Sequence, residues 1–212
     1  MKPDVLTKTQ FDLIKRLACL EKWGFYMAGG TGLALQLSHR TSVDFDFYSP
    51  KTFIAEEVLA ELRKDFTEIS VRQALVNTLI LSINNVDLSF FYYPYKLLKP
   101  LIKYESVNLA SRQDIAAMKV AAIVQRGKRR DFIDIYFLLQ RLSLKEIIKF
   151  AIQKYPGYQE MLILRALIYF EDAEKEELGR KIVIFDKSFS WEKAKKEIFE
   201  KVKEHQLNMI KK

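Results

Sequence analysis

Hydrophobic positions in the first hundred residues follow two different periods. Residues 7–22 and 52–64 carry apolar side chains three and four positions apart, the spacing that predicts amphipathic helices. Residues 25–28 and 43–48 are short apolar runs that predict strands, and Gly24 is expected to end the first helix. This half of the chain therefore predicts a mixture of helices and strands.

A β-hairpin is predicted further along. Residues 78–83 and 86–93 are rich in β-formers and are joined by Asn84 and Asn85. Asparagine tolerates the positive φ angles of a tight turn, so the two runs are expected to pair. Residues 68–74 give a weaker indication of another strand.

From residue 101 onward the pattern predicts only helices, and Ser143 and Glu146 have capping-box spacing. We therefore expect an α+β protein, with an α/β unit built on a mixed sheet over residues 1–100 and a helical bundle over residues 101–212. No flexible linker separates the halves, so we expect them to pack around a shared cleft. The expected helices of the bundle span residues 111–126, 131–141, 143–154, 159–170 and 190–206.

Composition indicates a packed, basic protein. Of the 212 residues, 49% are hydrophobic and 29% are charged, which excludes a disordered chain. The formal net charge of +8 favours an anionic partner, although many proteins are mildly basic without one. The chain has one cysteine, and it shows neither a signal peptide nor an apolar run of about 20 residues. We therefore expect a cytoplasmic protein with no membrane contact.

Two carboxylates on one predicted strand form the first candidate site. Asp44 and Asp46 are two residues apart, so in a strand they point to one face with Cα atoms about 6.8 Å apart. Like charges at this spacing repel, and a divalent cation such as Mg²⁺ (or Mn²⁺) would remove the conflict. The alternative is a solvent-facing edge strand with ordinary alternation.

A glycine pair precedes this strand. Gly29 and Gly30, followed by Thr31, lie between a predicted strand and a short helix predicted over residues 33–37. Glycines let the backbone approach a ligand closely, and N–H groups at a helix N-terminus suit a phosphate. A tight strand–helix turn without a ligand explains the same residues equally well.

A third carboxylate, Asp87, begins the second strand of the predicted hairpin. Ser89, Phe91 and Tyr93 should lie on its face of that strand. If the hairpin lies beside Asp44, Asp87 would complete a triad of carboxylates; otherwise it is a polar residue next to the turn.

In the helical half, Lys119 interrupts the apolar run over residues 115–124. An ammonium there either extends to water or points at an anion, and Arg126, seven residues on, shares its helix face. Since only a charge would be removed, Lys119→Ala is expected to lower activity and to leave folding intact.

A basic cluster precedes two further acids. One interpretation of this cluster is that it attracts a triphosphate or an RNA. The alternative is an ordinary solvated loop between helices. The basic residues are Arg126, Lys128, Arg129 and Arg130. Asp131 and Asp134 have the spacing of a helix N-cap and third residue, so they are either structural or functional. Arg40, ahead of the Asp44 strand, is a candidate phosphate contact or a loop residue.

Taken in order, these motifs resemble the AbiEii/AbiGii toxin family, within the nucleotidyltransferase superfamily headed by DNA polymerase β. The stretch from Lys119 through residues 130–136 is similar to that family's downstream motif, so the resemblance spans roughly residues 25–140. Many superfamily members have Gly-Ser where this chain has Gly-Gly followed by Thr. The residues that carry the resemblance are Gly29-Gly30-Thr31-x-Leu33-Ala34-Leu35 and His39-Arg40-x-Ser42-x-Asp44-Phe45-Asp46-Phe47.

The resemblance implies transfer of a nucleotide from an NTP to an acceptor, such as RNA at a tRNA end, by a toxin with an antitoxin encoded nearby. Two alternatives remain: a non-catalytic nucleotide- or partner-binding module, and a transferase that modifies protein hydroxyls. The residues implied as catalytic are Asp44, Asp46, Asp87, Lys119 and Asp131. The first three of these are also the implied metal ligands. Those implied in nucleotide binding are Gly29, Gly30, Thr31, Arg40, Arg126, Arg130 and Asp134.

Overall fold

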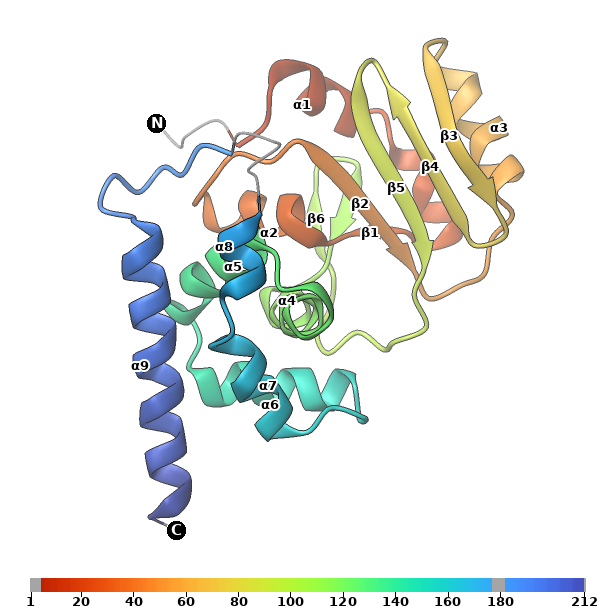
Figure 1. Ribbon diagram of the computed structural model, residues 1–212. Coiled ribbons are helices and arrows are strands. Elements are labelled where there is room, and N and C mark those ends of the chain that lie inside the picture. The colour runs from red at the N-terminus through yellow and green to blue at the C-terminus, as the bar shows by residue number, and fades with distance from the viewer. Residues whose placement is uncertain (1–4, 177–181, 212) are drawn as a thin grey trace. The chain divides into compact units, whose positions relative to one another are not determined.

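The computed structural model describes residues 5–176 and 182–211, and the chain divides after Ser111 into two compact units. The first unit contains a seven-stranded sheet, and the second consists of helices (Figure 1). The expected α+β class is confirmed.

The sheet is mixed, as predicted, with strand order β3-β4-β5-β2-β1-β7-β6. β2 runs parallel to β5, and β1 runs parallel to β7, while the other neighbours are antiparallel. This order places β2 at the centre of the sheet, beside β5. The strands are β1 (Tyr26–Met27), β2 (Asp44–Ser49), β3 (Ile69–Leu75), β4 (Thr78–Ile83), β5 (Val86–Tyr92), β6 (Ile102–Tyr104) and β7 (Val107–Leu109).

The predicted hairpin is confirmed. β4 and β5 pair antiparallel from Ile83 and Val86 outward, and the turn between them consists of Asn84 (φ 50°) and Asn85 (φ 63°). Both turn residues thus have the positive φ angles that asparagine tolerates. The weaker strand expected near residues 68–74 is β3.

Helices cover one face of this sheet and bury its apolar side chains. Phe45 and Phe47 of β2 and Phe90 of β5 are fully buried in a core that also includes residues of the covering helices. Figure 1 shows α3 against β3 and β4. The helices of this unit are α1 (Lys8–Ile14), the 3₁₀ helix η1 (Ala18–Trp23), α2 (Gly29–Leu37) and α3 (Ala55–Asp65).

The single helix predicted over residues 7–22 is wrong, because the structure has α1 followed by η1. Leu17 N–H bonds to the carbonyl of Ile14, and Arg16 N–H bonds to that of Leu13. Such three-residue spacing tightens the backbone beyond an α-helix. Gly24 does end the segment, in the left-handed conformation with φ 69°.

Two strands beyond residue 100 were not predicted. β6 and β7 form a short hairpin, and β7 joins the sheet beside β1, with Met27 opposite Leu109. Three-residue strands are too short to show a period of two, so the sequence carries little sign of them. The first unit consequently ends at Ser111, beyond the boundary expected at residue 100.

In the second unit, α4 packs on α5, α6 and α7 (Figure 1). The capping box of Ser143 and Glu146 is confirmed at the start of α6. Among the helices in the described residues of this unit, the short α8 was not predicted. The helices are α4 (Arg112–Arg126), α5 (Arg129–Leu139), α6 (Leu144–Lys154), α7 (Glu160–Leu167), α8 (Glu171–Lys175) and α9 (Trp191–Ile210).

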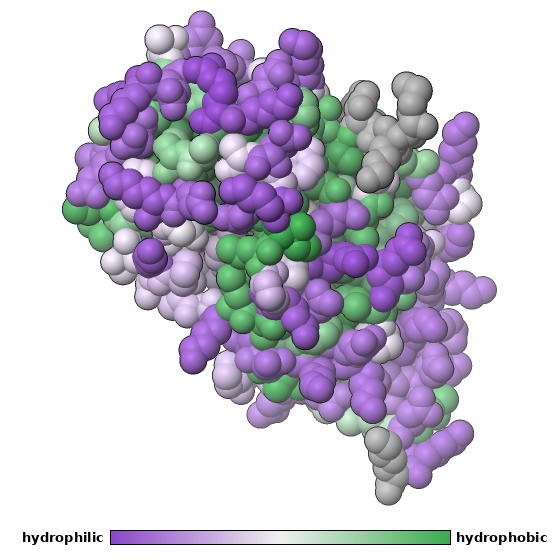
Figure 2. Space-filling model, turned by 180° about the vertical axis from the view of Figure 1, so that it is seen from behind, coloured by the Kyte–Doolittle hydropathy of each residue, from purple (hydrophilic) through white to green (hydrophobic). Residues whose placement is uncertain are grey.

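Hydrophilic residues dominate the face of the molecule shown in Figure 2, with smaller hydrophobic patches between them. Within the described ranges, no helix has both the length and the apolar character to cross a membrane.

Candidate functional site

The two faces of β2 differ sharply in chemistry. Phe45 and Phe47 point into the core and are 0% exposed, whereas Asp44 and Asp46 are half-buried on the opposite face. The predicted alternation is therefore present, and both carboxylates share one side of a central strand. We call this side, which also carries Asp87, the carboxylate face.

The glycine pair lies directly against Asp46. The N–H of Ala28 bonds to the carbonyl of Asp46 at 3.0 Å, and α2 then begins at Gly29 itself, ahead of the start predicted at residue 33. Gly29 has φ 61°, and a Cβ atom there would lie 2.6 Å from Oδ2 of Asp46. A side chain at position 29 would thus strain the backbone and displace the carboxylate.

Arg40 lies against the next glycine. A Cβ atom at Gly30 would collide with Nη2 of Arg40, and the Arg40 side chain is almost fully buried. Its Nη1 also donates to the carbonyl of Thr41 at 2.9 Å. The first turn of α2 is therefore accompanied by a fixed positive charge.

Thr31 anchors α2 to the start of β2. Its hydroxyl lies 2.7 Å from Oγ of Ser42 and donates to the carbonyl of Asp44, and the residue is 1% exposed. These contacts fix the helix N-terminus next to the carboxylates. A phosphate contact by the Thr31 hydroxyl stays a prediction.

Asp87 lies opposite Asp44 in the parallel pairing of β2 and β5, so the hairpin does lie beside Asp44. The carboxylate of Asp87, however, pairs with Nη2 of Arg72 at 2.6 Å. Arg72 occupies a β-bulge between Val71 and Gln73 on β3, from which it extends across β4.

Asp44, Asp46 and Asp87 lie on one face of the sheet, and metal binding by the three together stays a prediction. In the part of the chain that the structure describes, no three histidine, cysteine or carboxylate side chains lie close enough to hold a metal ion together. In this structure the third carboxylate, Asp87, is paired with the Arg72 guanidinium. Arg72 could not be identified from the sequence, because the pair is formed across an intervening strand.

In the second unit, Lys119 lies between two carboxylates. Its Nζ is 2.8 Å from Oδ1 of Asp131 and 2.6 Å from Oδ2 of Asp134, and Nε of Arg126 is 3.2 Å from Oδ2 of Asp131. The Lys119 side chain is only 7% exposed. Of the two expected alternatives, the ammonium thus points at anions and not to water, and Arg126 shares its face as predicted.

Neither aspartate caps the helix, so the capping alternative is wrong. The N-cap of α5 is Lys128, and Asp131 is the third residue of the helix. Burial alone would raise the pKa of Asp131, but the charges of Lys119 and Arg126 outweigh it and hold the pKa below its ordinary value. Asp131 is therefore ionised at neutral pH.

Arg129 of the basic cluster has a structural role. Its Nε donates to the carbonyl of Ala173 at 3.0 Å, and its guanidinium lies over the ring of Trp191 at 5.2 Å. Arg130 is half-buried beside it. A contact of Arg130 with nucleotide stays a prediction.

Sequence reasoning also missed an ion pair inside the second unit. Nζ of Lys154 on α6 lies 2.9 Å from Oδ1 of Asp114 on α4, and both side chains are 0% exposed. The partners are 40 residues apart, so no local spacing could reveal the contact.

Residues 86–204 match the model of a family described as "Nucleotidyl transferase AbiEii toxin, Type IV TA system". The match covers more than half of the chain and includes Asp87, Lys119 and Asp131. The chain belongs to this family and is a nucleotidyltransferase of the toxin–antitoxin type. The glycine pair and Asp44 precede the matched region.

A protein of Aquifex aeolicus (strain VF5), named "Uncharacterized protein aq_aa25", is 35% identical to this chain over 187 residues, 85% of this chain and 87% of the relative. The crystal structure of JHP933 from Helicobacter pylori covers 98% of this chain and all of its own, with a TM-score of 0.57 and 15% identity. A second H. pylori crystal structure covers 97% of this chain and 98% of its own, with a TM-score of 0.60 and 14% identity. These two structures show the fold alone.

Proposed function

We propose that this enzyme moves a nucleotide from an NTP to an RNA acceptor, at a tRNA end, in a reaction that depends on Mg²⁺ or Mn²⁺. One observation carries the proposal: Asp44 and Asp46 share one face of β2, with Gly29 in contact with Asp46. A backbone without a side chain next to two carboxylates leaves room for a nucleotide and its cation.

The donor set fits Mg²⁺. This ion is usually bound through one or two carboxylates, with waters and substrate phosphates as its other ligands, so Asp44 and Asp46 suffice. A bound cation would neutralise charge on the transferring phosphate. In this proposal Asp87 leaves Arg72 when substrate binds, and either becomes a further ligand or accepts the proton of the acceptor hydroxyl.

The phosphates of the NTP would lie at the start of α2. N–H groups in the first helical turn have no partner within the helix, and the Gly30 N–H is one of these. Arg40, held against Gly30, supplies positive charge at the same place. Thr31 contributes by holding α2 against β2.

The charged cluster of the second unit would also bind phosphate. We assign Lys119 the phosphate contact, with Asp131 and Asp134 orienting its ammonium. Arg126, whose side chain is 52% exposed, and Arg130 would contact nucleotide or RNA phosphates. An antitoxin encoded nearby would restrain the enzyme in the cytoplasm.

The experiment combines purified protein with Mg²⁺, total RNA and each NTP labelled at the α-phosphate, followed by separation of RNA from protein. We expect label on RNA with at least one NTP, and none when Mg²⁺ is chelated. Asp46→Asn should lower the rate at least about a hundredfold, because a lost metal ligand removes several kcal/mol of charge stabilisation. Asp12→Asn, an exposed carboxylate on α1, is the matched control and should transfer at the full rate.

Two results would contradict the proposal. Label on the protein fraction, with none on RNA, would make the acceptor a protein hydroxyl. An absence of transfer with all four NTPs would favour a non-catalytic binding module.

A further inference from the structure

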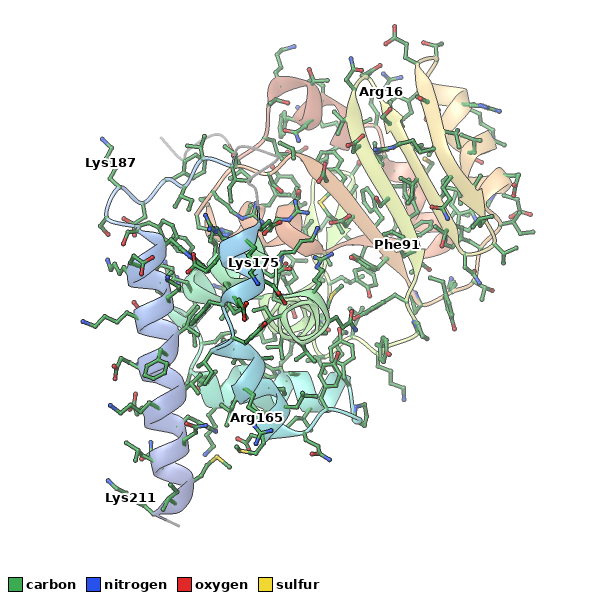
Figure 3. All side chains as sticks on the ribbon, viewed as in Figure 1. Arg16, Phe91, Arg165, Lys175, Lys187 and Lys211 are labelled. Carbon is green, nitrogen blue, oxygen red and sulfur yellow. The ribbon has the colours of Figure 1, made fainter. Side chains whose placement is uncertain are left out.

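A row of aromatic rings continues the carboxylate face beyond Asp46. Two residues after Asp46, Tyr48 points to the same face, and its ring centroid lies 5.9 Å from that of Phe91 and 5.2 Å from that of Tyr93. The Tyr93 ring in turn lies 5.0 Å from that of Tyr95. We call Tyr48, Phe91, Tyr93 and Tyr95 the aromatic ladder; Figure 3 labels Phe91 on β5.

The ladder differs from the aromatic core on the other side of the same strands. There, the rings of Phe47 and Phe90 stack at 5.2 Å and are both 0% exposed. In the ladder, Tyr48 and Phe91 are only half-buried, and Tyr95 is 41% exposed. The ladder therefore keeps ring surface accessible.

Positive charge continues from the ladder. Residues 91–104 contain three lysines and neither aspartate nor glutamate. These residues, Lys96, Lys99 and Lys103, are all exposed. Nζ of Lys103 lies 3.8 Å from Oε2 of Glu21, whereas Lys96 and Lys99 are nearer to the rings in the sequence. Accessible rings beside exposed lysines are the combination with which proteins bind single-stranded nucleic acid, through base stacking and phosphate attraction.

We propose that the aromatic ladder binds the single-stranded end of the RNA acceptor. Bases stack on Tyr93 and Tyr95, and phosphates lie near Lys96 and Lys99. Tyr48 follows Asp46 by two residues, or about 6.8 Å along the strand, so RNA held there would bring its terminal hydroxyl toward the carboxylates. This inference rests on the proposed function, because it requires that the acceptor is RNA.

The test measures binding of a fluorescent single-stranded oligoribonucleotide of about ten nucleotides, a length within the usual site size for such proteins. Tyr95→Ala should weaken binding about fivefold to a hundredfold, the loss typical of one stacked base, whereas Tyr95→Phe should bind as the wild type does. Tyr92→Ala is the matched control, since Tyr92 is 37% exposed on the opposite face of β5. Thermal unfolding of each variant checks that it is folded.

An oligoribonucleotide with abasic sites separates stacking from charge attraction. Wild type should bind it more weakly than the intact strand, and Tyr95→Ala should not weaken that binding further. The proposal that the ladder binds RNA would be contradicted if Tyr95→Ala and Tyr93→Ala were both folded and bound RNA as tightly as the wild type does.

The labelled-NTP reaction distinguishes this failure from failure of the proposed function. If wild type transfers label to RNA while the ladder variants bind and react as wild type does, only the ladder inference fails. If wild type labels protein and not RNA, both fail together.

Discussion

A Cβ atom at Gly29 would lie 2.6 Å from Oδ2 of Asp46, so the glycine turn and the carboxylate pair form one structural unit. The left-handed φ of Gly29, 61°, brings the backbone to this position. The turn thus leaves the Asp46 carboxylate in place directly beside the start of α2.

Gly29→Ala should therefore weaken both folding and substrate binding. A non-glycine residue at this φ costs about 1–2 kcal/mol, and the added methyl group displaces Asp46. We expect the free energy of unfolding to fall by that amount and the affinity for Mg²⁺-nucleotide to fall at least about tenfold, a shift of 1.4 kcal/mol. Chemical denaturation and calorimetry measure the two effects.

Gly157→Ala is the control for this change. A Cβ atom at Gly157 meets nothing within 4 Å, and its φ is not positive. If Gly29→Ala bound nucleotide as tightly as Gly157→Ala does, the glycine turn would not belong to the site.

Arg72→Gln should lower the Mg²⁺ concentration that transfer requires, with little effect on the free energy of unfolding. The Arg72 and Asp87 side chains are 49% and 27% exposed, and such surface pairs contribute about 0–1 kcal/mol to stability. Removing the guanidinium removes the ion pair between Arg72 and Asp87, so the Mg²⁺ concentration that supports half-maximal transfer should fall. Arg63→Gln, an exposed arginine on α3, serves as control. An unchanged Mg²⁺ dependence would exclude Asp87 from the metal site.

Lys119→Ala should destabilise the second unit, contrary to the expectation from sequence. The substitution leaves Asp131 and Asp134 buried without the ammonium between them, and breaking a buried pair costs about 3–5 kcal/mol. Replacing both aspartates by asparagine in the same variant should recover much of the loss, as denaturation will show. Lys149→Ala, an exposed lysine on α6, should be neutral. Full stability of Lys119→Ala would mean that the pairs contribute nothing.

The stability contributed by Asp131 should depend on pH. Its folded pKa lies below the ordinary value of 3.8, so folding favours the ionised form. The contribution is complete above about pH 5 and is lost as the pH falls below 3.8 toward the folded pKa. Wild type and Asp131→Asn should therefore differ in free energy of unfolding most at neutral pH and least in acid. A difference that does not change with pH would refute this assignment.

Some features of this protein were determined by short stretches of sequence. The alternation around Asp44 and Asp46, the hairpin turn at Asn84, and the capping box at Ser143 each depend on residues within a few positions of one another. Period, turn conformation and helix caps are local properties of the backbone, so they can be recognised without knowledge of the fold.

Other features were decided only by the tertiary structure. Arg72 reaches Asp87 across β4, and Lys154 reaches Asp114 over 40 residues of sequence. Nothing near either partner in the chain marks these contacts, because the order of strands and the packing of helices determine which distant side chains meet. For the same reason, the sequence could not show that Asp87, which lies opposite Asp44 on the same face of the sheet, is paired with Arg72.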